Sequence, residues 1–206
     1  MDQAGVAGDK SSRAAWESWL VFADESGQNL RPPKGKTWAP RGRTPVLPVS
    51  YGDRGRVSIA ALICIKPGER VRLIYRTITY HQRKGERKGF TAADFAALLQ
   101  AAHAQLGGPI SLVWDSMPEH VSARMRQWIA GHADWLLVYR LPAYAPDINP
   151  VEAIWSSLRA ALLNFAVRGI DELTVLIKHR LKRMQYQPEL LAGFISKTGL
   201  TIPELL

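Results

Sequence analysis

The chain has 206 residues, enough for one sizeable hydrophobic core and fewer than two full domains usually need. Hydrophobic residues make up 47% and charged residues 22%, which excludes an intrinsically disordered protein, and the longest apolar segment, 57–65, is too short to cross a bilayer as a helix. The single cysteine, Cys64, excludes an internal disulfide and fits a reducing compartment.

The positive charge is concentrated in one segment. The formal net charge is +9, and residues 31–90 hold 15 Lys and Arg against three acidic residues, whereas residues 91–206 hold ten of each sign. Such a segment is typical of a surface that binds phosphate groups, with an affinity that falls as salt rises. A solvated basic surface that only aids solubility is the alternative, and charge alone does not separate the two.

The first half of the chain predicts three strands and two basic loops. Residues 1–17 are small and polar, without the apolar segment of a signal peptide, and we expect a frayed leader. An apolar strand at 19–23 follows, and then a loop at 27–50 that is rich in Pro, Gly, Lys and Arg. Two β-rich segments, 57–65 and 71–79, are separated by a Pro-Gly turn and predict a hairpin, which a polar loop at 80–90 follows.

The second half alternates helices and strands. Thr91 and Asp94 have the spacing of a capping box, and they begin a helix that Gly107 ends. Ser116 and Glu119 have the same spacing and predict the start of a second helix. The remaining elements are strands at 110–114 and 135–141, helices at about 149–165 and 171–186, and a broken tail at 187–206.

This order of elements defines the fold class that we expect. A hairpin followed by alternating helices and strands predicts an α/β fold, with a mixed sheet and helices on its faces. We therefore expect one domain over residues 18–186, between the leader and the tail.

Three acidic residues are predicted to meet at one edge of the sheet. Asp24 and Asp115 each follow an apolar strand directly, and Glu152 begins the helix after the next strand. A right-handed crossover makes the strands at 110–114 and 135–141 parallel, so the segments that follow them leave the sheet at the same end. Carboxylates at such an edge suit two Mg²⁺ ions that catalyse phosphodiester displacement.

Each acid also has a structural interpretation. With Asn149 as N-cap, Glu152 has the position of a capping-box glutamate, and from spacing alone this role is the more frequent one. Asp24 fits a turn, and Glu25 beside it is an equal candidate ligand. Asp115 fits the cap of the helix that begins near Ser116.

Three blocks of sequence carry a more specific pattern: Leu20-Val-Phe-Ala-Asp-Glu-Ser26, Leu112-Val-Trp-Asp-Ser-Met-Pro-Glu-His120 and Leu141-Pro-Ala-Tyr-Ala-Pro-Asp-Ile-Asn-Pro-Val-Glu-Ala-Ile-Trp155. The last is the most specific, since its Pro, Tyr, Asn, Glu and Trp are rarely met at this spacing elsewhere. Together with Trp38-Ala-Pro-Arg-Gly42, these blocks resemble the catalytic domain of the mariner superfamily of DDE transposases, particularly its bacterial insertion-sequence branch. The resemblance covers about residues 19–185.

The resemblance implies a fold and a set of site residues. The fold is ribonuclease-H-like, as in retroviral integrases, with a five-stranded mixed sheet flanked by helices. Asp24, Asp115 and Glu152 match the metal-binding triad of the family, which holds two Mg²⁺ or Mn²⁺ ions. His120 matches a histidine that the family often has five residues after the second acid, and we expect it near the scissile phosphate, with a helix-surface position as the alternative. Ser116 departs from the usual asparagine, which puts one local hydrogen bond in doubt.

The resemblance also implies an activity and its partners. We expect a metal-dependent DNA endonuclease and strand transferase that cuts transposon ends at terminal inverted repeats and joins them to target DNA, as a homodimer on DNA in the cytoplasm, associated with the nucleoid. Trp38, Tyr80 and Tyr144 are candidates for stacking on bases, although core packing is the commoner role for Trp38. The residues expected to hold DNA phosphates are Arg31, Lys34, Lys36, Arg41, Arg43, Arg83, Lys84, Arg87 and Lys88.

The position of the first acid leaves three alternatives for the function. Transposases that this chain resembles carry helix-turn-helix modules before the catalytic domain, and residue 24 leaves no room for them. The chain is then one half of a split transposase, whose N-terminal half is encoded in another frame, or an inactive DNA-binding remnant. Another ribonuclease-H-like nuclease is a further alternative, which the block at 141–155 disfavours.

Overall fold

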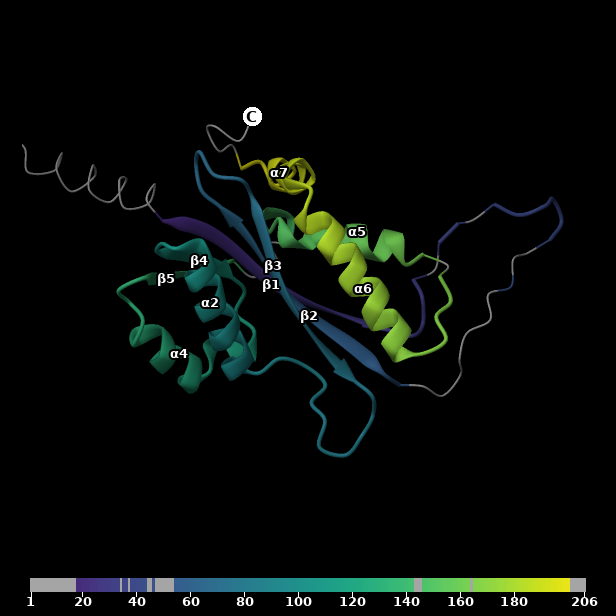
Figure 1. Cartoon of the computed structure of the whole chain (residues 1–206), viewed down its shortest axis with the longest axis horizontal. Coiled ribbons are helices and arrows are strands. Elements are labelled where there is room, and N and C mark those ends of the chain that lie inside the picture. Colours follow the sequence, from purple (N-terminus) through teal and green to yellow (C-terminus); the bar gives the residue numbers. More distant parts are fainter. Residues whose placement is uncertain are drawn as a thin grey trace, which may run out of the picture.

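A five-stranded sheet forms the centre of the protein (Figure 1). The computed structural model describes residues 18–33, 35–36, 38–43, 46, 54–142, 146–163 and 165–200. The strand order is β3-β2-β1-β4-β5, in which β1 pairs antiparallel with β2 and parallel with β4. The predicted mixed sheet is therefore confirmed. The strands are β1 (Trp19–Asn29), β2 (Arg56–Ile65), β3 (Arg72–Tyr80), β4 (Ile110–Trp114) and β5 (Leu136–Arg140).

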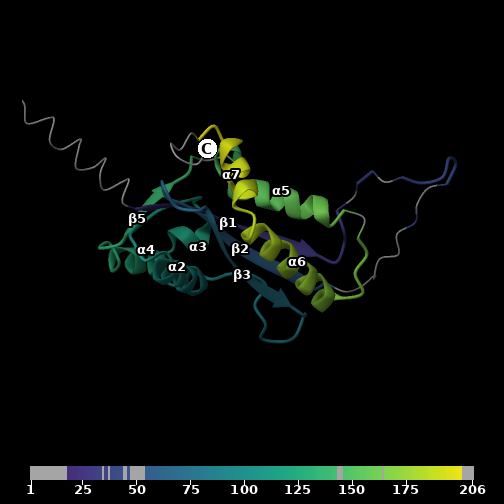
Figure 2. The ribbon, with the colours of Figure 1, turned by 45° about the horizontal axis from the view of Figure 1, so that its top comes forward.

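Helices cover both faces of this sheet, as Figure 2 shows from a second direction. One face carries α2 (Ala92–Leu106), α3 (Pro118–Val121) and α4 (Ala123–Ala130). The other face carries α5 (Val151–Ala161), α6 (Ile170–Gln185) and α7 (Pro188–Ser196), and a short 3-10 helix (Pro146–Ile148) precedes α5. None of the helices in the described ranges is long and apolar enough to cross a membrane.

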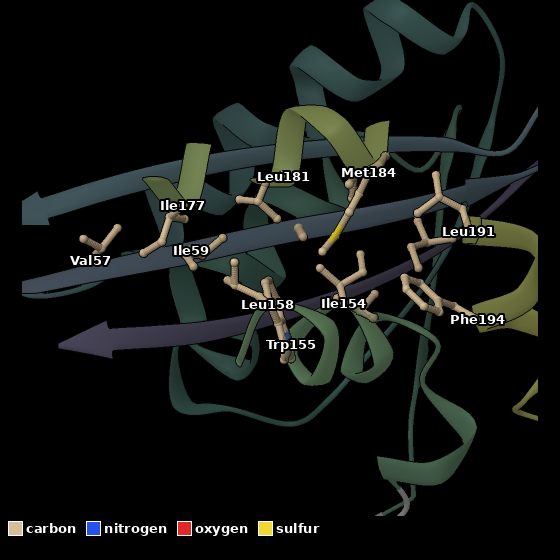
Figure 3. Packing of buried hydrophobic residues seen from close by; sticks show 14 of the residues in the cluster. Val57, Ile59, Ile154, Trp155, Leu158, Ile177, Leu181, Met184, Leu191 and Phe194 are labelled. Atoms are coloured by element: carbon tan, nitrogen blue, oxygen red, sulfur yellow. The ribbon is translucent and has the colours of Figure 1, made fainter. Parts of the chain in front are cut away.

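The core has two layers because the central strands are buried on both faces. Alternate residues of β2 enter the two layers, with Ile59 and Ile63 facing α5–α7 and Leu62 facing α2. Figure 3 shows the first of these layers, where side chains from β2 meet those of α5, α6 and α7. Full burial of one such aliphatic side chain stabilises the fold by roughly 1.5–3 kcal/mol, so the sheet is a rigid support for the residues at its edge.

The first strand is longer than the sequence predicts. The apolar segment ends before Asp24, but β1 continues to Asn29 because β2 pairs with it along its whole length, up to Asn29 opposite Arg56. The parallel pairing of β1 with β4 is described only as far as Phe22 opposite Val113. Asp24 thus lies inside β1, just past this parallel pairing, and the interpretation of Asp24 as a turn residue is wrong.

The helix boundaries confirm one predicted cap and correct another. The capping box of Thr91 and Asp94 is present, and Gly107 ends α2 in the left-handed conformation with a φ of 68°. The helix expected from Ser116 is instead two short helices, because Pro118 begins α3 and the Ser122 hydroxyl caps α4 by accepting from the Met125 N–H. The segment between Trp114 and α3 is therefore irregular, which frees the Asp115 carboxylate from a helix cap.

The C-terminal residues form an element that the sequence does not predict. Residues 187–206 read as a broken tail, yet they contain α7, whose Leu191, Phe194 and Ile195 are buried in the layer shown in Figure 3. Pro188 stands at the first turn of α7, where its missing N–H has no cost, so this proline starts a helix. The hydrophobic core therefore includes residues beyond 186.

Candidate active site

Asp24 is a partly buried carboxylate held by a tryptophan from the far end of the sequence. The indole N–H of Trp155 donates to Asp24 Oδ2 at 2.7 Å. The pKa of Asp24 is raised to about 6, mainly by burial and also by the negative charges of Glu152 and Asp115, while the hydrogen bond from Trp155 opposes the shift. Glu152 and Asp115 therefore both lie within electrostatic reach of Asp24.

Asp115 follows β4 and accepts two hydrogen bonds on the same oxygen. Its Oδ1 accepts from the Met117 backbone N–H at 3.1 Å and lies 2.7 Å from Nδ1 of His120. Although burial raises the pKa of Asp115, the hydrogen bonds from His120 and Met117 hold it below its ordinary value. Asp24 and Asp115 are therefore shifted in opposite directions, so that near pH 5 Asp115 is ionised while Asp24 is mostly protonated.

His120 lies inside the protein and not on a helix surface. Its exposed fraction is 2%, so the helix-surface interpretation is wrong. The imidazole stacks on the Trp114 ring, with 4.0 Å between centroids and 8° between planes, and it meets the Phe95 ring edge to face at 4.5 Å. Because a carboxylate only accepts, Nδ1 is the donor to Asp115. A direct contact between His120 and a DNA phosphate stays a prediction.

Glu152 lies in the first turn of α5, beside Asp24. The helix begins at Val151 with Pro150 as N-cap and without a side-chain capping hydrogen bond, so the capping-box interpretation of Glu152 finds no support. The buried Asn149 joins α5 to β1, because its Nδ2 donates to the Ala23 carbonyl at 3.3 Å while its Oδ1 accepts from the Val151 N–H at 3.2 Å. This pair of bonds fixes the start of α5 next to Asp24.

Glu25 points to the opposite side of β1 from Asp24. Successive residues of a strand face opposite sides, and Asp24 faces α5 whereas Glu25 lies within electrostatic reach of His120 and Glu119 on α3. Burial raises the pKa of Glu25, and the charge of His120 opposes this shift. The charge of Asp115 raises the pKa of both Asp24 and Glu25, whereas the charge of Glu152 acts on Asp24, and the choice of Asp24 as the partner of the two other acids stays a prediction.

The carboxylates at this edge are chemically suited to a divalent cation, but in the described part of the chain the structure does not bring three of them together around one point. Carboxylate oxygens are the ligands that Mg²⁺ and Mn²⁺ prefer, and a cation would relieve the repulsion that raises the pKa of Asp24. Within the described ranges, no three His, Cys, Asp or Glu side chains lie close enough together to form a finished metal site. That the three acids share bound ions therefore stays a prediction.

The basic residues expected to hold DNA differ in their surroundings. Arg87 forms an ion pair with Asp94 and donates to the Thr91 hydroxyl, so this arginine also stabilises the start of α2. Lys88 lies over the Tyr80 ring at 5.4 Å. Lys34 falls outside the described residues, and the other candidates are exposed, namely Arg31, Lys36, Arg41, Arg43, Arg83 and Lys84.

The three aromatic candidates for stacking on bases also differ in their exposure to solvent. Trp38 is fully exposed, so the expectation that it packs in the core is wrong. Tyr80 is partly exposed beneath Lys88, and Tyr144 falls outside the described residues. An exposed indole and a tyrosine beside a lysine are suitable for contact with bases, which stays a prediction.

Sequence reasoning missed the polar role of Trp155. It assigned Trp155 to the apolar face of its helix, and the residue is indeed 1% exposed and packed in the layer of Figure 3. The available signal is its spacing, because residues three apart share a helix face, and Trp155 follows Glu152 by three. The partner of its N–H lies 131 residues away in the sequence, which spacing does not reveal.

Comparison with known proteins assigns this chain to a family. The family model described as DDE superfamily endonuclease matches residues 19–174. The solved structure "Mos1 transposase paired-end complex with left transposon end" has a TM-score of 0.58 and 16% identity, and the match covers 94% of this chain and 59% of that one. "Crystal structure of the catalytic domain of Mos1 mariner transposase" has a TM-score of 0.52 and 15% identity, with 96% of this chain and 90% of that one covered.

At such identity the likeness shows the fold, which is ribonuclease-H-like, as expected from the sequence. The chain spans about three fifths of the Mos1 transposase in its paired-end complex. No curated protein sequence matches the chain.

Proposed function

The chain belongs to the DDE superfamily of endonucleases, and we propose that it is the catalytic domain of a DNA transposase from the bacterial insertion-sequence branch of the mariner superfamily. The observation that carries the proposal is the partly buried Asp24 carboxylate under the charges of Glu152 and Asp115. Negative charges placed close together at a sheet edge destabilise the fold. Such arrangements are found mainly at functional sites. A role in binding divalent cations accounts for this arrangement.

The three acids would divide the metal ligation among them. Asp24 would bridge two Mg²⁺ or Mn²⁺ ions, and Asp115 and Glu152 would each hold one. When bound, such a pair of ions activates the attacking oxygen and stabilises the leaving oxygen of a phosphodiester. The solved Mos1 paired-end complexes with Mg and with Mn are consistent with this cofactor.

The rigid sheet would set the spacing of the ligands. Asp24 and Asp115 come from neighbouring strands, and the bonds of Asn149 hold the first turn of α5 against β1. The protein would thereby supply preorganised carboxylates, while DNA binding would supply the reacting phosphate. Cleavage at transposon ends would free a 3′-hydroxyl, which would then attack target DNA.

The basic segment would bind the phosphates of the DNA. Arg83 and Lys84 are exposed cations in the loop after β3, whereas Arg87 is already paired with Asp94. We expect the double variant Arg83→Glu, Lys84→Glu to weaken duplex binding at least about tenfold at 100 mM salt, because the affinity of DNA-binding proteins depends on the number of phosphates they neutralise. Filter binding across a salt series measures this, and the slope of log K against log salt should become shallower by about 2.

The control for this prediction is Lys197→Glu, which changes the charge of an exposed residue just after α7. This variant should bind duplex DNA nearly as well as the wild-type protein. A loss in Lys197→Glu in proportion to its charge change, which is half that of the double variant, would show that net charge, and not the loop after β3, governs binding.

The parts of a complete transposase outside this chain are also proposals. The Mos1 transposase chain in the paired-end complex is longer than this chain, since the match covers 59% of it. The remaining length is sufficient for helix-turn-helix modules that recognise terminal inverted repeats. We propose that these modules come from an N-terminal half encoded in another frame, that the catalytic domains act as a homodimer on DNA, and that the protein is associated with the nucleoid in the cytoplasm.

The proposed function is tested by incubating the protein with end DNA, target plasmid and Mg²⁺. We expect Mg²⁺-dependent strand cleavage and joined products. Binding without cutting would favour the DNA-binding remnant, and cutting of RNA–DNA hybrids in preference to duplex DNA would favour another ribonuclease-H-like nuclease.

A further inference from the structure

We propose that Trp155 and His120 are positioning residues, which hold the carboxylates of Asp24 and Asp115 in the orientation that binds cations. This inference rests on the proposed function. Each ring donates one N–H to one carboxylate oxygen, Trp155 to Oδ2 of Asp24 and His120 to Oδ1 of Asp115, both at 2.7 Å. Asp115 accepts from both His120 and Met117 on Oδ1, which keeps the lone pairs of Oδ2 for a cation. Asp24 also accepts a backbone hydrogen bond from Glu25.

Trp155 connects two of the three acids through one hydrogen bond. It follows Glu152 by three residues on α5, so the two side chains share a helix face, and its indole reaches across to Asp24 on β1. Trp155 is 1% exposed, so without Asp24 its N–H would be buried and unpaired, which destabilises the fold. The indole therefore fixes both the rotamer of Asp24 and its distance from the helix that carries Glu152.

His120 holds Asp115 from within the aromatic cluster. The imidazole is confined by Trp114 at 4.0 Å and Phe95 at 4.5 Å, so its Nδ1 remains directed at Asp115. Its Nε2 is buried and has no hydrogen-bond partner among the described residues, which leaves Nδ1 as the polar atom that secures the ring. With an exposed fraction of 2%, His120 acts on the reaction through Asp115.

A purely structural role makes a different prediction from a positioning role. If the rings only fill the core, their replacement changes stability and leaves cation affinity intact. If they orient the ligands, cation affinity follows the N–H donor, since groups behind the ligands of a metal site typically change its affinity 10–100-fold. Variants that separate ring volume from the N–H donor therefore decide between the two roles.

Four variants of the full 206-residue chain provide this separation. His120→Phe keeps an aromatic ring and removes the donor, whereas His120→Asn loses ring volume and keeps a nitrogen donor at the position of Nδ1. Trp155→Phe removes the donor from α5. Trp128→Phe on α4 is the matched control, because Trp128 belongs to the α2–α4 layer and stacks on His132.

Calorimetric titration with Mn²⁺ in the absence of DNA, together with Tm, measures the two properties separately. We expect Trp155→Phe and His120→Phe to raise the Kd for Mn²⁺ about tenfold or more, and His120→Asn and Trp128→Phe to stay within about threefold of wild type. We expect His120→Asn to lower Tm more than His120→Phe does.

The opposite pattern would overturn the proposal. If Mn²⁺ affinity follows Tm, so that His120→Phe and Trp155→Phe bind as the wild type does, the two rings are packing residues only. If the wild-type protein itself binds no Mn²⁺, the proposed function fails and this inference fails with it. The wild-type titration thus distinguishes the two failures.

Discussion

Asp115→Asn is expected to reduce Mg²⁺-dependent DNA cleavage by at least about 10²–10³-fold. The amide removes a negative charge from the proposed metal site, yet its oxygen still accepts the hydrogen bonds from His120 and Met117 that Asp115 Oδ1 accepts. The fold should therefore persist while the chemistry is lost. Single-turnover cleavage of end DNA at saturating protein measures the rate, and Tm checks the fold.

Asp134→Asn is the matched control for this loss. Asp134 is an exposed acid in the turn before β5, and β5 follows that turn at Leu136. The same change of charge there should leave the cleavage rate within about twofold of wild type, since isolated surface charges contribute little. Cleavage by Asp115→Asn at the wild-type rate would remove Asp115 from the mechanism.

The second large effect is a change of stability at Asp24 in the absence of metal. Burial and the nearby acids raise the pKa of Asp24 from 3.8 to about 6, so its ionisation is resisted by the fold. The stability that this group contributes is complete below pH 3.8 and is lost as pH rises through about 6. Since one pKa unit corresponds to about 1.4 kcal/mol, the loss at pH 7.5 is about 3 kcal/mol.

Asp24→Asn should abolish this loss. We expect the variant to match the wild type near pH 4 and to exceed its free energy of unfolding by up to about 3 kcal/mol at pH 7.5, in urea denaturation with a chelator present. Asp115 changes stability in the opposite direction, because the lowered pKa of Asp115 gives stability that is lost as pH falls. This contribution largely cancels in the difference between the two proteins.

Added Mg²⁺ should reverse the order of the two proteins. The wild type gains stability when a cation binds its folded state, and Asp24→Asn gains little. A stability difference that is constant from pH 4 to 8 would contradict the raised pKa of Asp24.

The sequence predicts the sheet well because its central strands are mostly apolar. Residues 110–114 are bounded by Pro109 and Asp115, and such runs form strands buried on both faces. The continuation of β1 past Asp24 was not predictable in this way. It depends on pairing with β2 up to Asn29, and register between distant segments leaves no local signal.

The sequence proposes the acids of the site but does not indicate the residues that support them. Spacing brought Asp115 and Glu152 to the same end of the sheet, because parallel strands end together. The burial of His120 follows from the break at Pro118, which makes α3 a single turn packed beside Phe95, and helical periodicity did not anticipate it. The sequence pattern indicates only an apolar role for Trp155. Its indole N–H bonds to Asp24, and only the tertiary structure reveals this contact.

The central claim is that Asp24, Asp115 and Glu152 hold divalent cations, and Mn²⁺ soaked into crystals of the protein tests it most directly. The anomalous difference map should place its strongest peak in contact with the carboxylates of Asp24 and Asp115, and a second ion between Asp24 and Glu152. Peaks confined to other surfaces, with these three carboxylates turned away from one another, would contradict the claim.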